Sequence, residues 1–341
     1  MDKIANPSAI RWGILGTGKI AQDFAGKLSQ VKGAIAQGVF SRNPQNASSF
    51  SSRFGVVSAY HSLPDFFKDP AIDVVYIATP TPLHQEHCLL ALEHGKAILC
   101  EKPFTLSWEA AQTVVEASRS KGLFCMEAMW LRFNPLIQEC KQLISQGKIG
   151  DLCSVNLEIG YRKDIAQLLS QEQGRGAMHL FGCYGLSLAF FLFGEPQSHK
   201  HEAIKNEAGV DLTASILLSY PQHTVSITAG IKGTHSNEVH IVGSEGSIHI
   251  TSPFIDATSL RVSTNSSKQV GFGQRLSNKL ARVTQPLNEL FSSTSQYKGS
   301  GLRGEAEETM RCLRQGLQES PLMPLDESLA IHRLLDEIRQ S

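Results

Sequence analysis

A lysine flanked by an acid and a proline stands at the end of an apolar run in the first third of the chain. The run Ile98–Cys100 leads directly into Glu101, Lys102 and Pro103. Lysine is rarely buried without a partner, and the proline restricts Lys102 to an extended conformation. An ammonium group held there would stabilise a developing alkoxide or lower the pKa of a neighbouring acid. Lys102 is therefore a candidate catalytic residue; the alternative is a structural ion pair with Glu101 or a surface carboxylate.

A glycine-rich turn near the N-terminus has the spacing that binds a dinucleotide. Its pattern, G-x-G-x-x-A, lies between an apolar run at 10–16 and a helical pattern. The first glycine allows a tight turn, the second lets the backbone approach a pyrophosphate, and the helix N-terminus faces the phosphates. The alternative is an ordinary tight turn. We expect this turn to bind the cofactor through Gly16, Thr17, Gly18, Lys19 and Ile20.

The next apolar stretch ends without the acid that usually binds the ribose 2′-hydroxyl of NAD. Phe40 is followed by Ser41, Arg42 and Asn43. This position has no carboxylate that would repel a 2′-phosphate, and the Arg42 guanidinium can form an ion pair with such a phosphate. Ser41 and Arg42 therefore predict NADP as the cofactor. NAD is the alternative if Arg42 is only a solvated surface residue.

These residues are positioned by alternating strands and helices over about the first 130 residues. Such alternation is typical of an α/β fold with a doubly wound parallel sheet, whose ligands bind at the carboxyl ends of the strands. The glycine turn, Arg42 and Lys102 all follow predicted strands. The sequence thus predicts a Rossmann dinucleotide-binding domain over residues 1–128. Its strands are expected within 10–16, 34–40, 72–79, 97–100 and 123–128.

The second half of the chain has a different pattern, in which apolar and polar residues alternate as in half-buried strands. We expect a C-terminal α+β domain over 129–341 that binds substrate and forms the oligomer, with C-terminal helices that can pack back on the first domain. Its sheet is predicted to be open and mostly antiparallel, with about five or six strands. The segment 264–301 is expected to be a long loop with one short helix. The clearest strands lie at 152–161, 212–220 and 224–231, and 238–250 is predicted to be a hairpin.

Composition argues against several function classes. The 341 residues suit two domains, and 32 Lys and Arg balance 32 Asp and Glu, which argues against nucleic acid as a partner. The longest apolar stretch, 186–194, is too short to span a bilayer. The first ten residues lack the apolar core of a signal peptide. Seven scattered cysteines without a C-x-x-C pair indicate reduced thiols and no metal site. We expect a cytoplasmic protein with a small-molecule substrate and no membrane partner.

Several motifs together resemble one family. They are G-x-G-x-I-A at 16–21, T-P-x-x-x-H at 79–84, E-K-P at 101–103 and the stretch FCMEAMWLRFNP at 124–135. Over nearly its whole length the chain resembles the glucose–fructose oxidoreductase/inositol dehydrogenase (Gfo/Idh/MocA) family. Within that family, the E-A-M-W-x-R-F-x-P stretch and the tyrosine at 184 look most like the dimeric dihydrodiol dehydrogenases.

The resemblance implies roles for residues in these motifs. It implies a cis Lys102–Pro103 bond, and it places Lys102 at the nicotinamide and the substrate. Tyr184 falls where dihydrodiol dehydrogenases have their catalytic tyrosine; the alternative is an aromatic residue at the rim of the core. A tyrosine with a pKa of about 10 is a poor base at pH 7, but a nearby Lys102 ammonium favours the phenolate. His84 matches the family histidine near the nicotinamide ribose; the alternative is an exposed helix residue. The same motifs imply cofactor contacts by Thr79, Pro80 and Glu101.

Three residues are candidates for the substrate site. Arg132 and Arg162 are expected to line the cleft, although each could instead form a surface or interdomain ion pair. Leu180 stands where relatives usually carry an aspartate one helical turn before the tyrosine or histidine. Because leucine cannot accept a hydrogen bond, Leu180 predicts a more apolar pocket than in sugar-oxidising relatives. His179 is rotated by about 100° on an α-helix, so it cannot replace that aspartate if the register holds.

Together these observations predict an NADP(H)-dependent oxidoreductase. It would transfer a hydride between the nicotinamide and a secondary alcohol or carbonyl of a diol, polyol or sugar-like substrate. The alternative is an NADP(H)-binding regulatory protein with weak or no catalysis, since fold does not fix function. We also expect a homodimer or higher homo-oligomer through the C-terminal sheet, because an open sheet face without helices must be covered.

Overall fold

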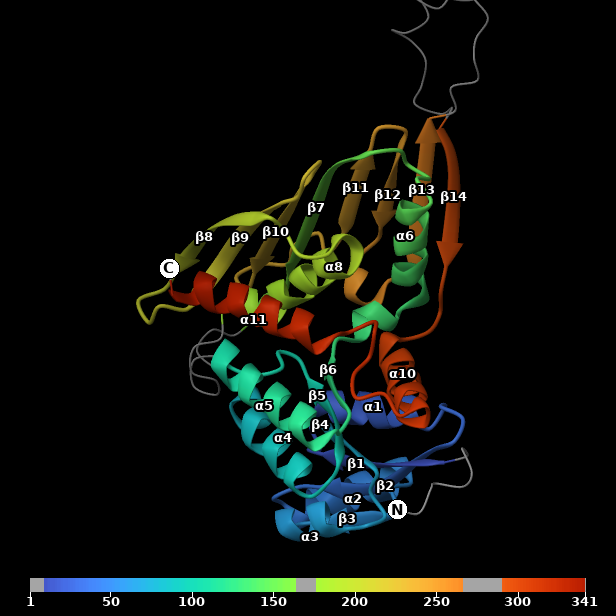
Figure 1. Cartoon of the computed structure of the whole chain (residues 1–341), viewed down its shortest axis with the longest axis vertical. Coiled ribbons are helices and arrows are strands. Elements are labelled where there is room, and N and C mark those ends of the chain that lie inside the picture. The colour runs from blue at the N-terminus through green and yellow to red at the C-terminus, as the bar shows by residue number, and fades with distance from the viewer. Residues whose placement is uncertain (1–8, 164–175, 266–289, 341) are drawn as a thin grey trace, which may run out of the picture.

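Two sheets lie one beyond the other along the long axis of the molecule (Figure 1). This computed structural model describes residues 9–163, 176–265 and 290–340. The N-terminal part forms the first sheet with its helices, and the C-terminal part forms the second. Helices from the end of the chain lie at the junction between the two sheets (Figure 1).

The first sheet has six parallel strands in the order β3-β2-β1-β4-β5-β6, which confirms the predicted Rossmann fold. Its strands are β1 (Ile10–Leu15), β2 (Ala34–Phe40), β3 (Ser58–Tyr60), β4 (Val74–Ile77), β5 (Ala97–Glu101) and β6 (Cys125–Ala128). Its helical segments are α1 (Lys19–Leu28), α2 (Pro44–Phe54), α3 (Leu63–Lys68), η1 (Thr81–Leu83), α4 (His84–Glu93) and α5 (Trp108–Lys121).

Local sequence signals explain where these elements begin and end. All four residues of β4 are buried, as expected for a parallel strand covered on both faces. The side chain of Asn43 accepts hydrogen bonds from the first turn of α2, and Ser107 caps α5 in the same way. Gly55 and Gly122 end these helices in the left-handed conformation. The short β3 and α3 carry no periodic pattern, and the sequence did not predict them.

The second sheet has eight strands in the order β14-β13-β12-β11-β7-β10-β9-β8. All neighbours are antiparallel except β7 and β10, so the open, mostly antiparallel sheet is confirmed. The expected hairpin at 238–250 is β11–β12. The strands are β7 (Leu152–Gly160), β8 (Ser198–Lys205), β9 (Asp211–Ser219), β10 (Thr224–Gly230), β11 (Val239–Gly243), β12 (Gly246–Ile250), β13 (Ser259–Asn265) and β14 (Leu290–Gln296).

The predicted number of five or six strands was too low. Strand β8 contains two histidines and two lysines, so its alternation carries little apolar signal. Strands β13 and β14 are rich in serine and threonine, and β14 lies inside the segment that we expected to be a loop. The two strands pair with each other, so the loop expectation is wrong at both ends of that segment. Its middle part, residues 266–289, lies outside the described residues.

Helical segments cover one face of the second sheet, and the chain then returns to the first (Figure 1). Helix α10 packs against α1, and α11 packs against α5 and α8. The segments are η2 (Trp130–Phe133), α6 (Pro135–Ser145), η3 (Met178–Gly182), α8 (Cys183–Phe193), η4 (Phe254–Asp256), α10 (Gly301–Gln315) and α11 (Leu325–Gln340). None of the helices in the described ranges has the length and apolar character needed to cross a membrane. Cys153 is exposed, whereas the other six cysteines are buried.

Candidate active site

The glycine turn forms a cradle at the N-terminus of α1. Gly16 has a φ of +117°, and a Cβ there would lie 2.7 Å from the carbonyl oxygen of Ala78 on the neighbouring strand. Gly18 is the N-cap of α1 and faces open space, and no side chain caps this helix end. Its first turn also contains no acidic residue. A bare helix N-terminus with room beside it suits the pyrophosphate of a dinucleotide.

Residues at the carboxyl ends of β2 and β4 extend this cradle. Ser41 and Arg42 directly follow β2, and the Arg42 side chain is exposed. Thr79 follows β4, and its hydroxyl lies 3.0 Å from Nδ1 of His87. Burial lowers the pKa of His87, and the nearby charge of Arg42 adds to this effect. The structure thus gathers Arg42, His87 and Thr79 at one edge of the sheet, where the ribose end of a dinucleotide would lie.

Lys102 directly follows β5 at the same edge. Its peptide bond to Pro103 is cis, as the family resemblance implied. The ammonium nitrogen donates a hydrogen bond to the carbonyl oxygen of Leu180, over 3.1 Å. The backbone N–H of Lys102 donates to the buried Glu101 carboxylate, which also accepts from the Tyr76 hydroxyl. Glu101 therefore anchors the loop from inside the core, while the Lys102 side chain reaches the second domain.

His84 is almost fully buried, so the alternative of an exposed helix residue is wrong. Its Nε2 lies 2.8 Å from the carbonyl oxygen of Thr79. Its Nδ1 lies 3.0 Å from the carbonyl oxygen of Pro103 and 3.2 Å from that of Phe104. The imidazole thus joins the carboxyl end of β4 to the loop that follows β5. Through these contacts His84 positions Lys102.

Tyr184 meets Lys102 from the other domain. The Lys102 ammonium nitrogen lies 4.2 Å from the centre of the Tyr184 ring. The indole N–H of Trp130 donates to the Tyr184 hydroxyl over 2.8 Å. Tyr184 is the second residue of α8, just after the π-helical segment η3, and only 5% of its surface is exposed. A cation, a phenol and an indole donor therefore converge at the edge of the nucleotide cradle.

The ionisation of this pair differs from the expectation for Tyr184. Burial raises the pKa of Tyr184 to about 12, although the charge of Lys102 opposes the shift. Burial also lowers the pKa of Lys102, but electrostatic interactions with Tyr184, Cys183 and Glu101 outweigh it, and the net pKa is raised. Tyr184 is thus a phenol and Lys102 an ammonium at neutral pH. Lys102 limits the cost of ionising Tyr184 but does not make the phenolate the resting form.

Arg132 does not line a cleft. Its side chain is fully buried, and its guanidinium donates to the hydroxyl and carbonyl oxygens of Ser187 and to the carbonyl oxygen of Leu322. It also forms an ion pair with Glu327 at 2.7 Å. These four donations make Arg132 part of a buried ion pair between η2 and α11 within the second half of the chain, rather than the surface or interdomain pair that was the alternative. The structure does not support the predicted substrate contact.

The other two predicted substrate residues lie in different surroundings. Arg162 is exposed just after β7, and this described part of the chain ends at residue 163. Leu180 is half-buried, and its carbonyl oxygen is the acceptor for Lys102. Residues 178–182 form a π-helix rather than an α-helix. The register that excluded His179 was therefore wrong, because hydrogen bonds of i→i+5 spacing change which residues share a face.

Two family models match most of the sequence up to residue 249. Residues 10–129 match the model described as an oxidoreductase family with an NAD-binding Rossmann fold. Residues 137–249 match the GFO/IDH/MocA C-terminal domain. The chain belongs to the GFO/IDH/MocA oxidoreductase family. The resemblance seen in the sequence is thereby confirmed.

Curated relatives from this family are similar over their full length. A trans-1,2-dihydrobenzene-1,2-diol dehydrogenase of Xenopus tropicalis is 33% identical over 97% of this chain and 98% of its own. The enzyme of the same name from Homo sapiens is 32% identical over 98% and 97%. These relatives agree with the resemblance to dihydrodiol dehydrogenases.

Solved structures share the fold at lower identity. A levoglucosan dehydrogenase in complex with NADH and levoglucosan has a TM-score of 0.82 at 20% identity, with 98% of this chain and 97% of that chain covered. A 3-ketoreductase from Actinomadura kijaniata, in complex with TDP-benzene and NADP, has a TM-score of 0.80 at 20% identity over 97% of both chains. At this identity the likeness shows the GFO/IDH/MocA fold alone.

Two residues that hold the candidate site together, Glu127 and Trp130, were not predicted from the sequence. The buried Glu127 accepts from the backbone N–H of Phe104 and from the Ser328 hydroxyl, so it ties the loop after β5 to α11. Trp130 was quoted within a motif but given no role. Glu127 also belonged to that motif, and the combination of an acid and a tryptophan in a buried stretch was the available signal.

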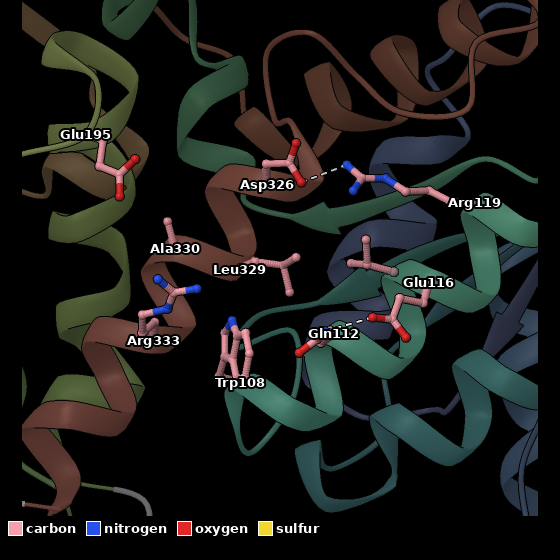
Figure 2. Close-up of a pocket in the computed structure, with 10 residues that line it drawn as sticks. Trp108, Gln112, Glu116, Arg119, Glu195, Asp326, Leu329, Ala330 and Arg333 are labelled. Carbon is pink, nitrogen blue, oxygen red and sulfur yellow. Dashed lines mark hydrogen bonds and ion pairs between the residues drawn. The ribbon is translucent and has the colours of Figure 1, made fainter.

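A separate pocket of about 420 Å³ lies between α5 and α11 (Figure 2). Trp108 and Arg119 line it from α5, and Asp326 and Arg333 line it from α11. Arg119 bridges the two helices through an ion pair with Asp326 at 2.9 Å. The lining contains none of the residues predicted to bind cofactor or substrate, so this pocket is distinct from the site around Lys102.

Proposed function

We propose that the protein is an NADP(H)-dependent dehydrogenase or reductase. It transfers a hydride between the nicotinamide and a secondary alcohol or carbonyl of a diol, polyol or sugar-like substrate. The meeting of Lys102 and Tyr184 at the edge of the nucleotide cradle carries this proposal, since the ammonium lies 4.2 Å from the phenol ring. Hydride transfer at a carbinol needs a proton donor and acceptor at the oxygen, and this pair provides both.

Tyr184 and Lys102 have different roles in the proton transfer. When a carbonyl is reduced, the Tyr184 hydroxyl gives its proton to the developing alkoxide, and Lys102 stabilises the phenolate that remains. When an alcohol is oxidised, the phenolate takes the hydroxyl proton while the hydride leaves the carbinol carbon. A nicotinamide dinucleotide held in the glycine cradle would supply or take up that hydride. Trp130 fixes the Tyr184 oxygen by donating to it over 2.8 Å.

NADP is the proposed cofactor. Arg42 is exposed at the carboxyl end of β2, and neither Ser41 nor Asn43 beside it is a carboxylate. A guanidinium there can form charge-assisted hydrogen bonds with a 2′-phosphate.

For the substrate we propose a cyclic vicinal diol with an apolar skeleton. The curated relatives are named for trans-1,2-dihydrobenzene-1,2-diol. In this chain the half-buried Leu180 lies beside Lys102, so a carboxylate that would bind extra hydroxyl groups is missing there. A polyol would leave some of its hydroxyl groups unpaired in such a pocket, which costs binding energy.

We further propose a cytoplasmic homodimer that forms through the second sheet and has no nucleic-acid or membrane partner. The outer face of that sheet has no helix over it among the described residues (Figure 1). It exposes Leu217 on β9 and Val242 on β11, at 41% each. A second copy would cover these apolar side chains and the broad face around them. Six buried cysteines, none of them in a disulfide bond, support a reducing compartment.

The test compares wild type with Lys102→Met. NADPH binding is followed by its fluorescence, and turnover is followed at the nicotinamide absorbance with trans-dihydrodiols, aldoses and dicarbonyls. We expect wild type to turn over a cyclic diol, and the variant to bind NADPH normally but lose turnover by at least about a hundredfold. Equal turnover by both proteins would rule out the proposed role. NADPH binding without turnover on any substrate would favour the regulatory alternative.

A further inference from the structure

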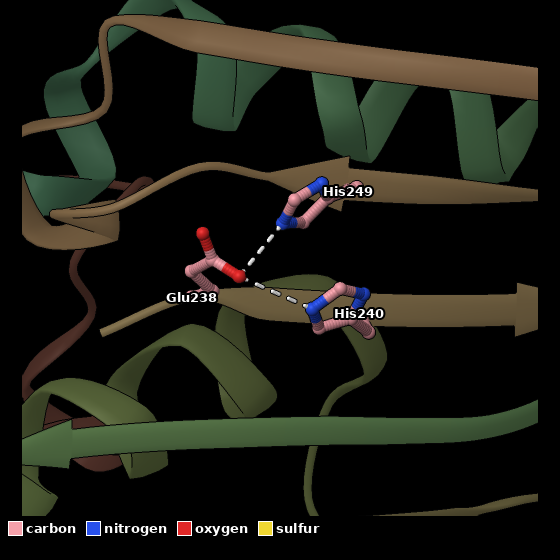
Figure 3. A group of neighbouring side chains, drawn as sticks. All are labelled: Glu238, His240 and His249. Carbon is pink, nitrogen blue, oxygen red and sulfur yellow. Dashed lines mark ion pairs between the residues drawn. The ribbon is translucent and has the colours of Figure 1, made fainter. Parts of the chain in front are cut away.

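Two histidines and a glutamate converge on the outer face of the second sheet (Figure 3). His240 lies on β11 and His249 on β12, directly opposite each other in the antiparallel register. Glu238 immediately precedes β11. One carboxylate oxygen of Glu238 lies 3.1 Å from Nε2 of His249 and 3.4 Å from Nε2 of His240. One ligand atom from each of the three residues thus lies within 4.8 Å of the other two.

The Nε2 atom of His249 faces the Glu238 carboxylate (Figure 3). This nitrogen is shielded from solvent. The neighbour that it faces is the Glu238 carboxylate oxygen, 3.1 Å away. A buried imidazole nitrogen beside a carboxylate oxygen is a pair of ligand atoms that one cation can bind together. A cation placed between the three ligand atoms would coordinate this nitrogen.

The hairpin holds these side chains on a rigid base. On the inner face, Val239 pairs with Ile250 and Ile241 pairs with Ile248, and all four residues are buried. The imidazole rings stack with their centres 4.2 Å apart and a 14° angle between their planes. Because strand register and core packing fix the backbone, little conformational entropy is lost when the two nitrogens bind one ion.

We propose that Glu238, His240 and His249 form a binding site for a divalent transition-metal ion, with Zn²⁺ as the preferred ion. Two imidazole nitrogens and one carboxylate oxygen are common zinc ligands, whereas Mg²⁺ and Ca²⁺ prefer oxygen alone. Three protein ligands leave one position of a tetrahedral zinc ion to water or another group. The face is the one on which we propose that a second copy docks, so that group can also come from the second copy.

One charged residue near the cluster would favour a bound cation, and another would disfavour it. Glu158 on β7 donates its backbone N–H to the carbonyl oxygen of Glu238, so a second carboxylate stands on the neighbouring strand, where it accepts a hydrogen bond from Ser236. Arg261 on β13 pairs with His249 and opposes a cation from the other side. Val155 and Leu157 show that the inner face of β7 is the buried one, and α8 with Tyr184 packs there. The cluster is therefore on the opposite face of the sheet from Tyr184, and the inference does not depend on hydride transfer.

The test measures Zn²⁺ binding to the full chain after dialysis against a chelator. Wild type is titrated with Zn²⁺ against a chromophoric competitor, and Co²⁺ is used as a visible-absorbing substitute. We expect His240→Asn and His249→Asn each to weaken Zn²⁺ binding at least about tenfold. The absorption of tetrahedral Co²⁺ should be lost in both variants. NADPH binding, measured by fluorescence, should stay unchanged because the other sheet carries it.

Two control variants separate this site from other surface ligands. His61→Asn removes an exposed histidine of the first domain, and Cys153→Ser removes the exposed thiol. Both controls should bind Zn²⁺ as wild type does. The inference is overturned if wild type binds no more Zn²⁺ than a triple variant of Glu238, His240 and His249. It is equally overturned if the two single histidine variants bind as tightly as wild type, or if Cys153→Ser abolishes binding.

Discussion

The ammonium nitrogen of Lys102 lies 4.2 Å from the centre of the Tyr184 ring, although Lys102 follows a strand of the first sheet and Tyr184 lies on a helix that packs on the second. Neither residue could be placed against the other by sequence spacing. The loop after β5 presents Lys102, and the junction of η3 and α8 presents Tyr184. The site is therefore complete only when the two parts of the chain are packed together.

Tyr184→Phe tests the proton step without removing the ring that Lys102 contacts. The ring and its cation contact remain, whereas the hydroxyl that Trp130 holds is lost. We expect kcat to fall by about 10²–10⁴ with little change in the affinity for NADPH. Steady-state kinetics with fluorescence titration will measure both. Undiminished kcat would show that another group moves the proton.

The pH dependence should differ between the two directions of the reaction. Burial raises the pKa of Tyr184 to about 12, so the phenol predominates at neutral pH. Oxidation needs the phenolate, so its rate should rise with pH across the alkaline range, whereas reduction should be nearly flat from neutral to mildly alkaline pH. Trp130 donates a hydrogen bond that lowers this pKa. Trp130→Phe should therefore shift the oxidation profile to higher pH, and an unshifted profile would contradict this account.

Arg42→Ala tests the choice of cofactor. Loss of a charge-assisted contact with the 2′-phosphate should weaken NADPH binding at least tenfold, which corresponds to about 1.4 kcal/mol, and should leave NADH binding unchanged. Titration of wild type and variant with both nucleotides gives the four affinities needed. Arg53→Ala serves as a matched control, because Arg53 is an exposed guanidinium in the last turn of α2 and is not among the expected cofactor contacts. A parallel loss for both nucleotides would indicate a general charge effect instead.

Arg132→Met tests whether Arg132 is structural. The buried guanidinium forms an ion pair with Glu327, whose side chain is 32% exposed. Removing one partner of a buried ion pair destabilises a protein, although here the partly exposed Glu327 can be solvated. We therefore expect the free energy of unfolding to fall by about 3 kcal/mol. Urea denaturation measures this change. A raised KM with unchanged stability would restore the substrate role that the sequence predicted.

The sequence allowed the first sheet to be predicted because its signals are local. Continuous apolar strands, a capping Asn43 and a terminal Gly55 act within a few residues of one another. The eight-stranded sheet was underestimated because β8, β13 and β14 gain their stability from neighbouring strands rather than from an apolar pattern of their own. Propensity in strands depends strongly on such context.

The site residues that belong to sequence motifs could be predicted, whereas those whose role depends on distant partners could not. Gly16, Lys102 and Tyr184 belong to recognisable motifs, and the structure brings the last two together. The burial of Arg132 and the clamping role of His84 depend on partners far along the chain. The π-helical register before Tyr184 also has no sequence signature of its own. The roles of these residues therefore depend on tertiary packing, which residue type alone does not predict.

Leu180→Asp tests why polyols should be poor substrates. The carbonyl oxygen of Leu180 accepts a hydrogen bond from Lys102, so its side chain begins beside the reacting groups. A carboxylate there can accept hydrogen bonds from hydroxyl groups, and it would attract the Lys102 ammonium. We expect kcat/KM for inositols and aldoses to rise at least about tenfold, and that for a cyclic apolar diol to fall.

Leu180→Asn is the matched control for this substitution. It supplies hydrogen-bonding atoms without the charge, so it separates recognition of hydroxyl groups from the effect of a carboxylate on Lys102. If hydroxyl recognition limits wild type, both variants should gain activity on polyols. If only Leu180→Asp gains, its charge acts through Lys102, and the pH profile of oxidation should change with it. Rapid turnover of polyols by wild type, near 10 per second as in a typical enzyme, would show that Leu180 does not restrict the substrate.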